Sequence, residues 1–322
     1  MAREHFQHGD YDAALLFCER YSDIAEASHN RAAQLVRDRI MALSLHLVGR
    51  HAEARPYAER ALNQPASLAR SVHKSFHEYD NRMASRSHLS RILWVQGYPD
   101  RAAVLAREGV EHALSLEYPP PLCYILVLAA CPIAFWTGDM EAARRYTRLL
   151  FEQTANLSSS YWQSWGHCYR AAMGLSADGG SDTFHEAVRS LRVMASQPGY
   201  TDMLATIQVE LAGPEAIARA VSGNTSWCAP EVLRAQAVGM LKQGDAQSAS
   251  RAEATCLHSL ALAREQGARS WELRTATTLA RLYQGTGRAI KAHQLLAPVY
   301  SGFSEGFGTA DLMGAAALLN AL

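Results

Sequence analysis

Several fragments of catalytic and metal-binding motifs occur in this chain, and each lacks a residue that its chemistry requires. His77-Glu78 begins like the zinc motif His-Glu-x-x-His, but position 81 is asparagine, so the second imidazole ligand is missing. His167-Cys168 is a ligand pair with no second pair at zinc spacing. The stretch Glu305–Thr309 contains two glycines but no lysine, and it follows no predicted strand, so it does not match a phosphate-binding loop.

Two complete motifs are absent from the sequence as well. It contains no Gly-x-x-x-x-Gly-Lys-Ser/Thr phosphate loop and no Gly-x-Ser-x-Gly nucleophile turn. A catalytic triad assembled from distant positions stays open, because sequence spacing does not test it. We therefore expect no catalytic residue, no cofactor-binding residue and no metal ligand, and we expect a protein that is not an enzyme.

One group of aromatic residues could form a binding surface. Trp162 and Trp165 are three positions apart on one face of a predicted helix, and Tyr161 and Tyr169 flank them. Two interpretations stay open. Core packing is favoured, because apolar residues at helical spacing usually mark a buried face. The other interpretation is a surface facing a ligand or partner, made of Tyr161, Trp162, Trp165 and Tyr169.

A recurring glycine predicts the helices that would position these residues. Each of six glycines has a small residue seven positions before it and an alanine five positions after it; they are Gly9, Gly49, Gly97, Gly138, Gly244 and Gly287. Two small residues twelve apart around a glycine suit antiparallel helices that pack closely across a tight turn. A repeat of this kind is typical of a helical-hairpin binding scaffold.

The repeat predicts an all-α fold, a tetratricopeptide-like right-handed superhelix of about seven helical hairpins with a C-terminal capping helix. The anchor glycines are 40, 48, 41, 106 and 43 residues apart, and the gap of 106 leaves room for about two irregular hairpins. We expect a single helical-repeat domain, 1–322, with regular units at about 1–62, 82–155 and 229–300, irregular units at about 158–221 and the capping helix at about 309–322.

Prolines and polar segments add local expectations. Pro119-Pro120-Pro121 is expected to form an extended linker, and Pro132 is expected to kink the helix that starts near Leu122. An additional helix is expected from about Ser67, and the irregular part is expected to contain a second helix at about 182–195. Thr309 is the expected N-cap of the terminal helix.

The composition limits the partners and the compartment. With 31 basic and 31 acidic residues the formal net charge is zero, which argues against a general nucleic-acid surface. The longest uncharged apolar run, Leu122–Trp136, is shorter than a membrane span requires, and we interpret it as a buried helix. The cysteines, at positions 18, 123, 131, 168, 228 and 256, form no Cys-x-x-Cys pair and are expected to be core thiols in the cytoplasm.

Three segments carry a resemblance to a known family. They are Leu93–Ala102, Pro121–Asp139 and the C-terminal stretch Ala263–Leu312, which includes Trp271-Glu-Leu-Arg274. Together they resemble the C-terminal tetratricopeptide-like region of bacterial STAND-type ATPase regulators. In that family a winged-helix DNA-binding domain or a class III adenylate or guanylate cyclase domain comes first, the ATPase follows, and the helical repeats come last. The resemblance covers about Gly9 to Leu322.

The resemblance implies a sensor or partner-binding arm that controls an ATPase switch. It does not carry over ATP hydrolysis, DNA reading or cyclisation, because the chain contains no phosphate loop and none of those domains fits in it. The implied partner is a protein or peptide, for example an ATPase or DNA-binding domain of the same longer polypeptide. Direct contact with nucleic acid or membrane is not expected, and the chain is either an excised arm or a free-standing relative.

Three hypotheses for function follow in order of preference. The first is a cytoplasmic, non-catalytic regulatory module that binds a protein or peptide partner or signal, as the sensor arm of a bacterial signalling or transcription regulator. The second is a small-molecule or peptide receptor with an enclosed pocket. The third, least favoured, is an enzyme built on a helical-repeat frame.

Overall fold

The computed structural model describes residues 10–64, 81–116, 118–155, 160–178, 198–209, 212–222 and 227–322, together with residues 5 and 189. Within these residues the regular structure is helical throughout and contains no strand. The all-α class predicted from the sequence is therefore confirmed. Gly9, the helix expected from Ser67 and, except for residue 189, the helix expected at 182–195 lie outside the described residues.

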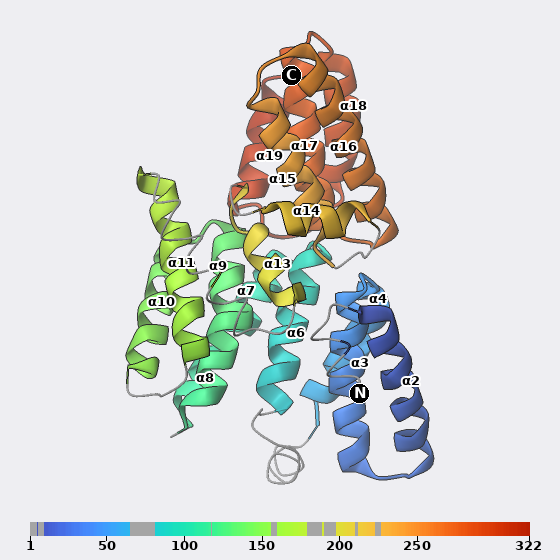
Figure 1. The fold of residues 1–322 in the computed structure, drawn as a ribbon, viewed down its shortest axis with the longest axis vertical. Helices are drawn as coiled ribbons and strands as arrows, with labels where there is room; N and C mark the ends of the chain where they lie inside the picture. The colour runs from blue at the N-terminus through green and yellow to red at the C-terminus, as the bar shows by residue number, and fades with distance from the viewer. Residues whose placement is uncertain are drawn as a thin grey trace.

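The helices of residues 10–178 lie side by side and form what we call the N-terminal stack (Figure 1). Each helix packs mainly on its neighbours in sequence, so α3 contacts α2, α4 and α6, and α10 contacts α9 and α11. The stack contains α2 (Tyr11–Ala27), α3 (Arg31–Leu47), α4 (His51–Leu62), α6 (Asn81–Val95), α7 (Pro99–Leu114), α8 (Pro119–Ile125), the π-helix η1 (Leu126–Ala130), α9 (Cys131–Thr137), α10 (Met140–Thr154) and α11 (Ser160–Asp178).

Residues 227–322 form a second group of helices, the C-terminal stack (Figure 1). Two short helices, α13 (Pro198–Ala205) and α14 (Pro214–Val221), lie between the stacks in sequence, and both contact α15. The last helix of the chain packs against the two before it. The C-terminal stack contains α15 (Ala229–Leu241), α16 (Ala246–Glu265), α17 (Arg269–Gly285), α18 (Ala289–Ser301) and α19 (Ala310–Asn320).

Left-handed glycines join consecutive helices. The five described members of the glycine pattern have φ angles between 75° and 88°, a region that glycine adopts without strain: Gly49, Gly97, Gly138, Gly244 and Gly287. The small residues seven positions earlier are all fully buried, namely Ala42, Ser90, Cys131, Ala237 and Ala280. The pattern therefore specifies two things at once, a tight turn and a close approach of the helices beside it.

The triple proline is helical, so the extended linker predicted for it is wrong. Helix α8 begins at Pro119, and only the preceding Tyr118 is extended, with φ −142° and ψ 111°. Prolines suit a first helical turn, because the first N–H groups of a helix have no partner within it and the proline ring already fixes a helical φ. The helix that is expected to kink at Pro132 contains the wider turn η1, which ends two residues before that proline and its missing N–H donor.

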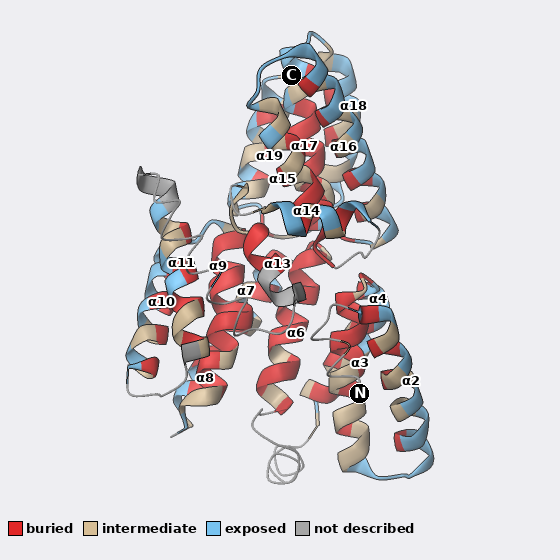
Figure 2. Cartoon of the chain, in the orientation of Figure 1, coloured by how far each residue is buried: buried red, intermediate tan, exposed pale blue. Residues whose placement is uncertain are grey.

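The C-terminal stack lies across the turn ends of the N-terminal stack and does not extend it sideways as a single row (Figure 1). Burial is concentrated where the two meet and along the inner helices, while the outer faces are exposed (Figure 2). A Cβ atom placed on Gly138 would lie 2.6 Å from the Cβ of Ala310, and one placed on Gly49 would lie equally close to the amide of Gln266. The same atom on Gly244 or Gly287 would meet nothing within 4 Å.

Replacing Gly138 with alanine is expected to destabilise the fold more than the same change at Gly287. Both glycines have positive φ angles, 80° and 75°, so each variant should lose about 1–2 kcal/mol to backbone strain. Only the methyl group at position 138 would collide with Ala310, which adds about 1–3 kcal/mol. Urea denaturation of the two variants measures the difference, and equal losses would contradict the close contact between the stacks.

Candidate binding site

Three of the four aromatic residues predicted as a partner surface lie in the core. Trp165 and Tyr169 are fully buried and Trp162 is 9% exposed, whereas Tyr161 is half-buried. The Tyr169 hydroxyl donates a hydrogen bond of 2.5 Å to the carbonyl oxygen of Val127 in η1, and burial raises the pKa of this phenol. Packing accounts for these side chains in this conformation, and Tyr161 alone presents a partly open face.

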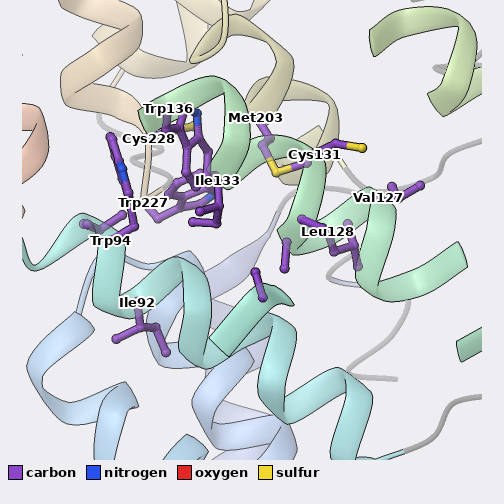
Figure 3. Packing of buried hydrophobic residues seen from close by; sticks show 14 of the residues in the cluster. Ile92, Trp94, Val127, Leu128, Cys131, Ile133, Trp136, Met203, Trp227 and Cys228 are labelled. Carbon is purple, nitrogen blue, oxygen red and sulfur yellow. The ribbon is translucent and has the colours of Figure 1, made fainter. Parts of the chain in front are cut away.

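The other four tryptophans meet where the two stacks join. Trp94 is near the end of α6, Trp136 is near the end of α9, Trp227 precedes α15 and Trp271 is in the first turn of α17, and none is more than 2% exposed. In five of the six pairs the ring centroids are 4.5 to 6.1 Å apart, in tilted or edge-to-face contacts that aromatic quadrupoles favour. Figure 3 shows Trp94, Trp136 and Trp227 gathered at this end of the helices. We call this region the joint.

Arg274 of α17 connects the helices that meet at the joint. Its Nε donates to the carboxylate of Asp311 at 2.7 Å, and its Nη1 donates to the carboxylate of Glu231 at 2.9 Å. The two terminal nitrogens also donate to the carbonyl oxygens of Thr206 and Trp136, at 3.1 and 3.2 Å. The guanidinium further lies 5.1 and 5.2 Å from the ring centroids of Trp94 and Trp271, within cation–π range. One side chain therefore bridges α15, α17, α19 and the end of α9.

The charges in the joint are balanced. Glu231, with a side chain only 1% exposed, accepts bonds from Arg274 and from both ends of the Arg234 fork at 2.7 and 2.8 Å. Burial opposes the charge on Glu231, but the two guanidinium groups outweigh it and hold the pKa of this carboxyl below its usual value. For Arg274, the carboxylates of Asp311 and Glu231 likewise outweigh burial and raise its pKa. Two cations therefore face two anions in a mostly buried network.

A rim of polar contacts surrounds the tryptophans. Arg101 donates through its backbone N–H and its Nε to the Glu305 carboxylate, at 3.0 and 2.7 Å. Asp100 accepts from the N–H of Gly306 at 2.8 Å, and the Ser270 hydroxyl donates to the carbonyl oxygen of Trp94. These bonds connect the α6–α7 turn to the start of α17 and to the loop before α19. The joint is thus held by groups that are distant in sequence.

A pocket of about 500 Å³ opens between α15 and α17 beside the joint. Its apolar wall is formed by Val238, Leu241 and Leu282. Its volume falls within the range of small-ligand sites in proteins. No acidic side chain is among the described residues that line this pocket.

The pocket and the joint share Arg234 and Thr278. Arg234 lines the pocket, and its Nη1 donates to the Thr278 hydroxyl at 3.3 Å while its Nε and Nη2 hold Glu231. Thr278 in turn donates to the carbonyl oxygen of Arg274 at 3.0 Å. A group bound in the pocket would therefore contact the same arginine that neutralises the buried carboxylate of the joint.

Three buried histidines lie near Arg91 of α6, and one of them packs against Trp227. Nδ1 of His46 is 3.0 Å from Nδ1 of His51, across the turn between α3 and α4, and the His46 ring centroid is 5.0 Å from that of Trp227. His88 of α6 lies within 3.4 Å of the Tyr124 hydroxyl. Burial first, and then the charge of Arg91, lowers the pKa of all three imidazoles, that of His51 to about 3.

The cysteines match the expectation of core thiols. All six are buried outside any disulfide, and burial raises the pKa of the thiols of Cys123 and Cys256 to about 11 and of Cys131 and Cys168 to about 12. Such thiols are poor nucleophiles and poor metal ligands at neutral pH. Among the described residues, no three histidine, cysteine or acidic side chains converge as a metal would require.

The apolar run identified in the sequence lies inside the fold. The continuous helical stretch Pro119–Thr137, with a mean hydropathy of 1.7, is long and apolar enough to cross a membrane by length and composition. Its most apolar window is 78% buried against the other helices. Core packing therefore accounts for its apolar character.

Sequence reasoning missed the residues that matter most at this site. Arg274 belongs to one of the segments that carry the family resemblance, but its partner Glu231 has no motif around it. The available signal was a glutamate and an arginine three positions apart in the otherwise uncharged helix Ala229–Leu241, a pairing that also occurs on exposed helices. No protein-family model and no curated protein sequence matches the chain.

Proposed function

We propose that this chain is a non-catalytic regulatory module of tetratricopeptide-like helical hairpins that binds a protein or peptide partner or signal. In this proposal it is the cytoplasmic sensor arm of a bacterial regulator of the STAND-ATPase type. Binding shifts the population between two arrangements of the N-terminal and C-terminal stacks, and a regulated domain responds to that shift.

The location of the resemblance segments supports the proposal. Trp94, Trp136 and Trp271 come from three segments far apart in the sequence, and all three pack in the joint. Asp100 of the first segment also bonds to Gly306 of the last. If the resemblance reflected only the general packing of helical hairpins, the resembling residues would be spread over every turn. These residues instead lie where the two stacks contact each other.

The observation that carries the proposal is the shared arginine. Arg234 has one nitrogen turned to the pocket hydroxyl of Thr278 and two on Glu231, the carboxylate that also binds Arg274. A partner that binds Arg234 in the pocket weakens the hydrogen bonds from Arg234 to Glu231. The Glu231 carboxylate then depends more on its bond to Arg274. Occupancy of the pocket is thereby coupled to the bond that connects the stacks.

The pocket also favours the second candidate function, a receptor for a small molecule. A volume of about 500 Å³ with both aliphatic and polar side chains in its lining accommodates a ligand of metabolite size. The two candidates share the site and the joint, and they differ only in whether the bound group is free or part of a chain.

Site-specific photo-crosslinking in cells tests the proposal. A photoreactive residue at Leu241, in the pocket wall, is expected to trap a discrete partner, whereas one at Leu257 is expected not to. Leu257 lies on α16 and is 47% exposed, so it is an accessible control outside the pocket. Equal trapping at both positions, or hydrolysis of ATP by the purified chain, would overturn the proposed function.

A further inference from the structure

We propose that the pocket between α15 and α17 binds a carboxylate carried on a short aliphatic chain, and that Arg281 recognises the carboxylate. This inference deepens the proposed function, on which it rests, by naming the chemistry of the bound group. We take the bound group to be the signal of the proposed function, and specifically a free small organic acid. A carboxylate at the end of a peptide offers the same chemistry, and the experiment separates the two sources.

The charge of the pocket selects an anion. Two arginines, Arg234 and Arg281, line it, and no acidic side chain is among its described lining residues. Arg234 is already neutralised by Glu231 behind it. Arg281 is an exposed residue that forms no ion pair with another described residue, so its charge is available to a ligand. A guanidinium fork matches a carboxylate in shape and hydrogen-bonding geometry.

The rest of the lining selects an aliphatic body. Val238 and Leu241 on α15 face the pocket together with Leu282 on α17, and these branched side chains offer no hydrogen bond. The hydroxyl of Thr286 donates back to the carbonyl oxygen of Leu282 at 2.9 Å, so it is already satisfied. An alkyl chain along this wall needs no hydrogen-bond partner, whereas a polar group there would have none. The pocket therefore suits a molecule with one charged end and one apolar end.

Gly285 is a pocket-lining residue with no side chain to occupy the space beside it. Gly285 lines the pocket, and a Cβ atom placed on it would meet nothing within 4 Å. A larger side chain at position 285 would therefore meet no clash at its Cβ, and we expect it to occupy part of the pocket. Gly239 on α15 is equally free of neighbours but is not part of the pocket lining. The two glycines form a matched pair for blocking the site.

Titration of the full chain with three probes of equal length tests the proposal. Hexanoate is expected to bind saturably with a dissociation constant of about 1 mM, and hexylamine and 1-hexanol at least about tenfold more weakly, by ligand-observed NMR at pH 7.5. A peptide ending in leucine is compared as the free acid and as the amide. Tighter binding of the free-acid peptide than of hexanoate would assign the carboxylate to a chain terminus.

Variants locate the site and separate this inference from the proposed function. Arg281→Gln and Gly285→Leu are each expected to weaken hexanoate binding at least about tenfold, whereas Arg251→Gln and Gly239→Leu should not. Arg251 is an exposed arginine of α16 outside the pocket. Equal binding of the three probes, no binding of any carboxylate, or unchanged binding in Arg281→Gln would overturn the inference. Partner trapping at Leu241 would survive that result if the proposed function is correct.

Discussion

Acidification from pH 6.5 to pH 4.5 is expected to destabilise this protein steeply, because three imidazoles are buried without charge. His46, His51 and His88 are all fully buried. Arg91 on α6 faces all three, and Arg39 on α3 adds its charge at His88. The hydroxyl of Tyr124 lies 3.4 Å from Nε2 of His88. A proton on any of these rings would place a second cation beside Arg91 in the core.

The sign of the effect follows from the lowered pKa values. In the unfolded chain each histidine titrates near 6.5, whereas in the folded chain burial keeps the pKa of His51 at about 3 and lowers those of His46 and His88 as well. The unfolded state therefore binds more protons below pH 6.5. The stability from these groups is fully present above pH 6.5 and is lost as the pH falls, by about 1.4 kcal/mol per pH unit for each histidine.

Urea denaturation between pH 4.5 and 6.5 measures this slope. Replacing His51 with asparagine should lower stability at pH 7 and reduce the slope by about 1.4 kcal/mol per pH unit. His258 is exposed on α16, and its replacement by asparagine removes a histidine without disturbing the buried cluster. If the slope of His51→Asn matched that of the unmodified protein, the neutral buried histidine would be ruled out.

Replacing Glu231 with alanine is expected to be the most damaging single change to the joint. It would leave Arg234 and Arg274, with side chains 15% and 13% exposed, facing each other without the carboxylate that both now bind. Removing one partner of a buried ion pair typically costs about 3–5 kcal/mol, because an uncompensated charge stays in the core. The variant should unfold at a lower urea concentration, and the joint should lose hydrogen-exchange protection first.

A surface ion pair supplies the control for this change. Glu111 lies 3.7 Å from Arg107 one helical turn away on α7, and both side chains are more than half exposed. Glu111→Ala is expected to change stability by less than about 0.5 kcal/mol. A loss in Glu231→Ala no larger than that in Glu111→Ala would show that the buried network does not hold the stacks together.

The helices and turns could be predicted from the sequence because their causes are local. Gly138, for example, adopts a positive φ angle without strain, so a glycine with small residues near it is enough to predict a turn there. The triple proline at Pro119 was misassigned because the same residues suit both an extended segment and a first helical turn. Where the helix begins depends on what the following residues can bury.

The candidate site could not be predicted from the sequence, since it is made by long-range contacts. Nothing near Ser270 indicates that its hydroxyl binds the backbone of Trp94, and nothing near Glu231 indicates Arg274 as its partner. The cluster at Trp162 and Trp165 drew attention by its spacing, but helical spacing is the same for a core face and a binding face. Burial separates the two, and burial depends on the whole fold.

The bonds between the turn ends and the C-terminal stack also bear on how the chain is made. Arg101 and Glu305 are 204 positions apart, and Trp94 and Ser270 are 176 positions apart. During synthesis at about 5–20 residues per second, the turns carrying Trp94 and Trp136 therefore leave the ribosome about 7–35 s before helix α17 that covers them. In that interval two large indoles and the left-handed turns beside them face solvent. Nascent chains should consequently need protection from aggregation until residue 311 has emerged, although each hairpin can form early from local contacts.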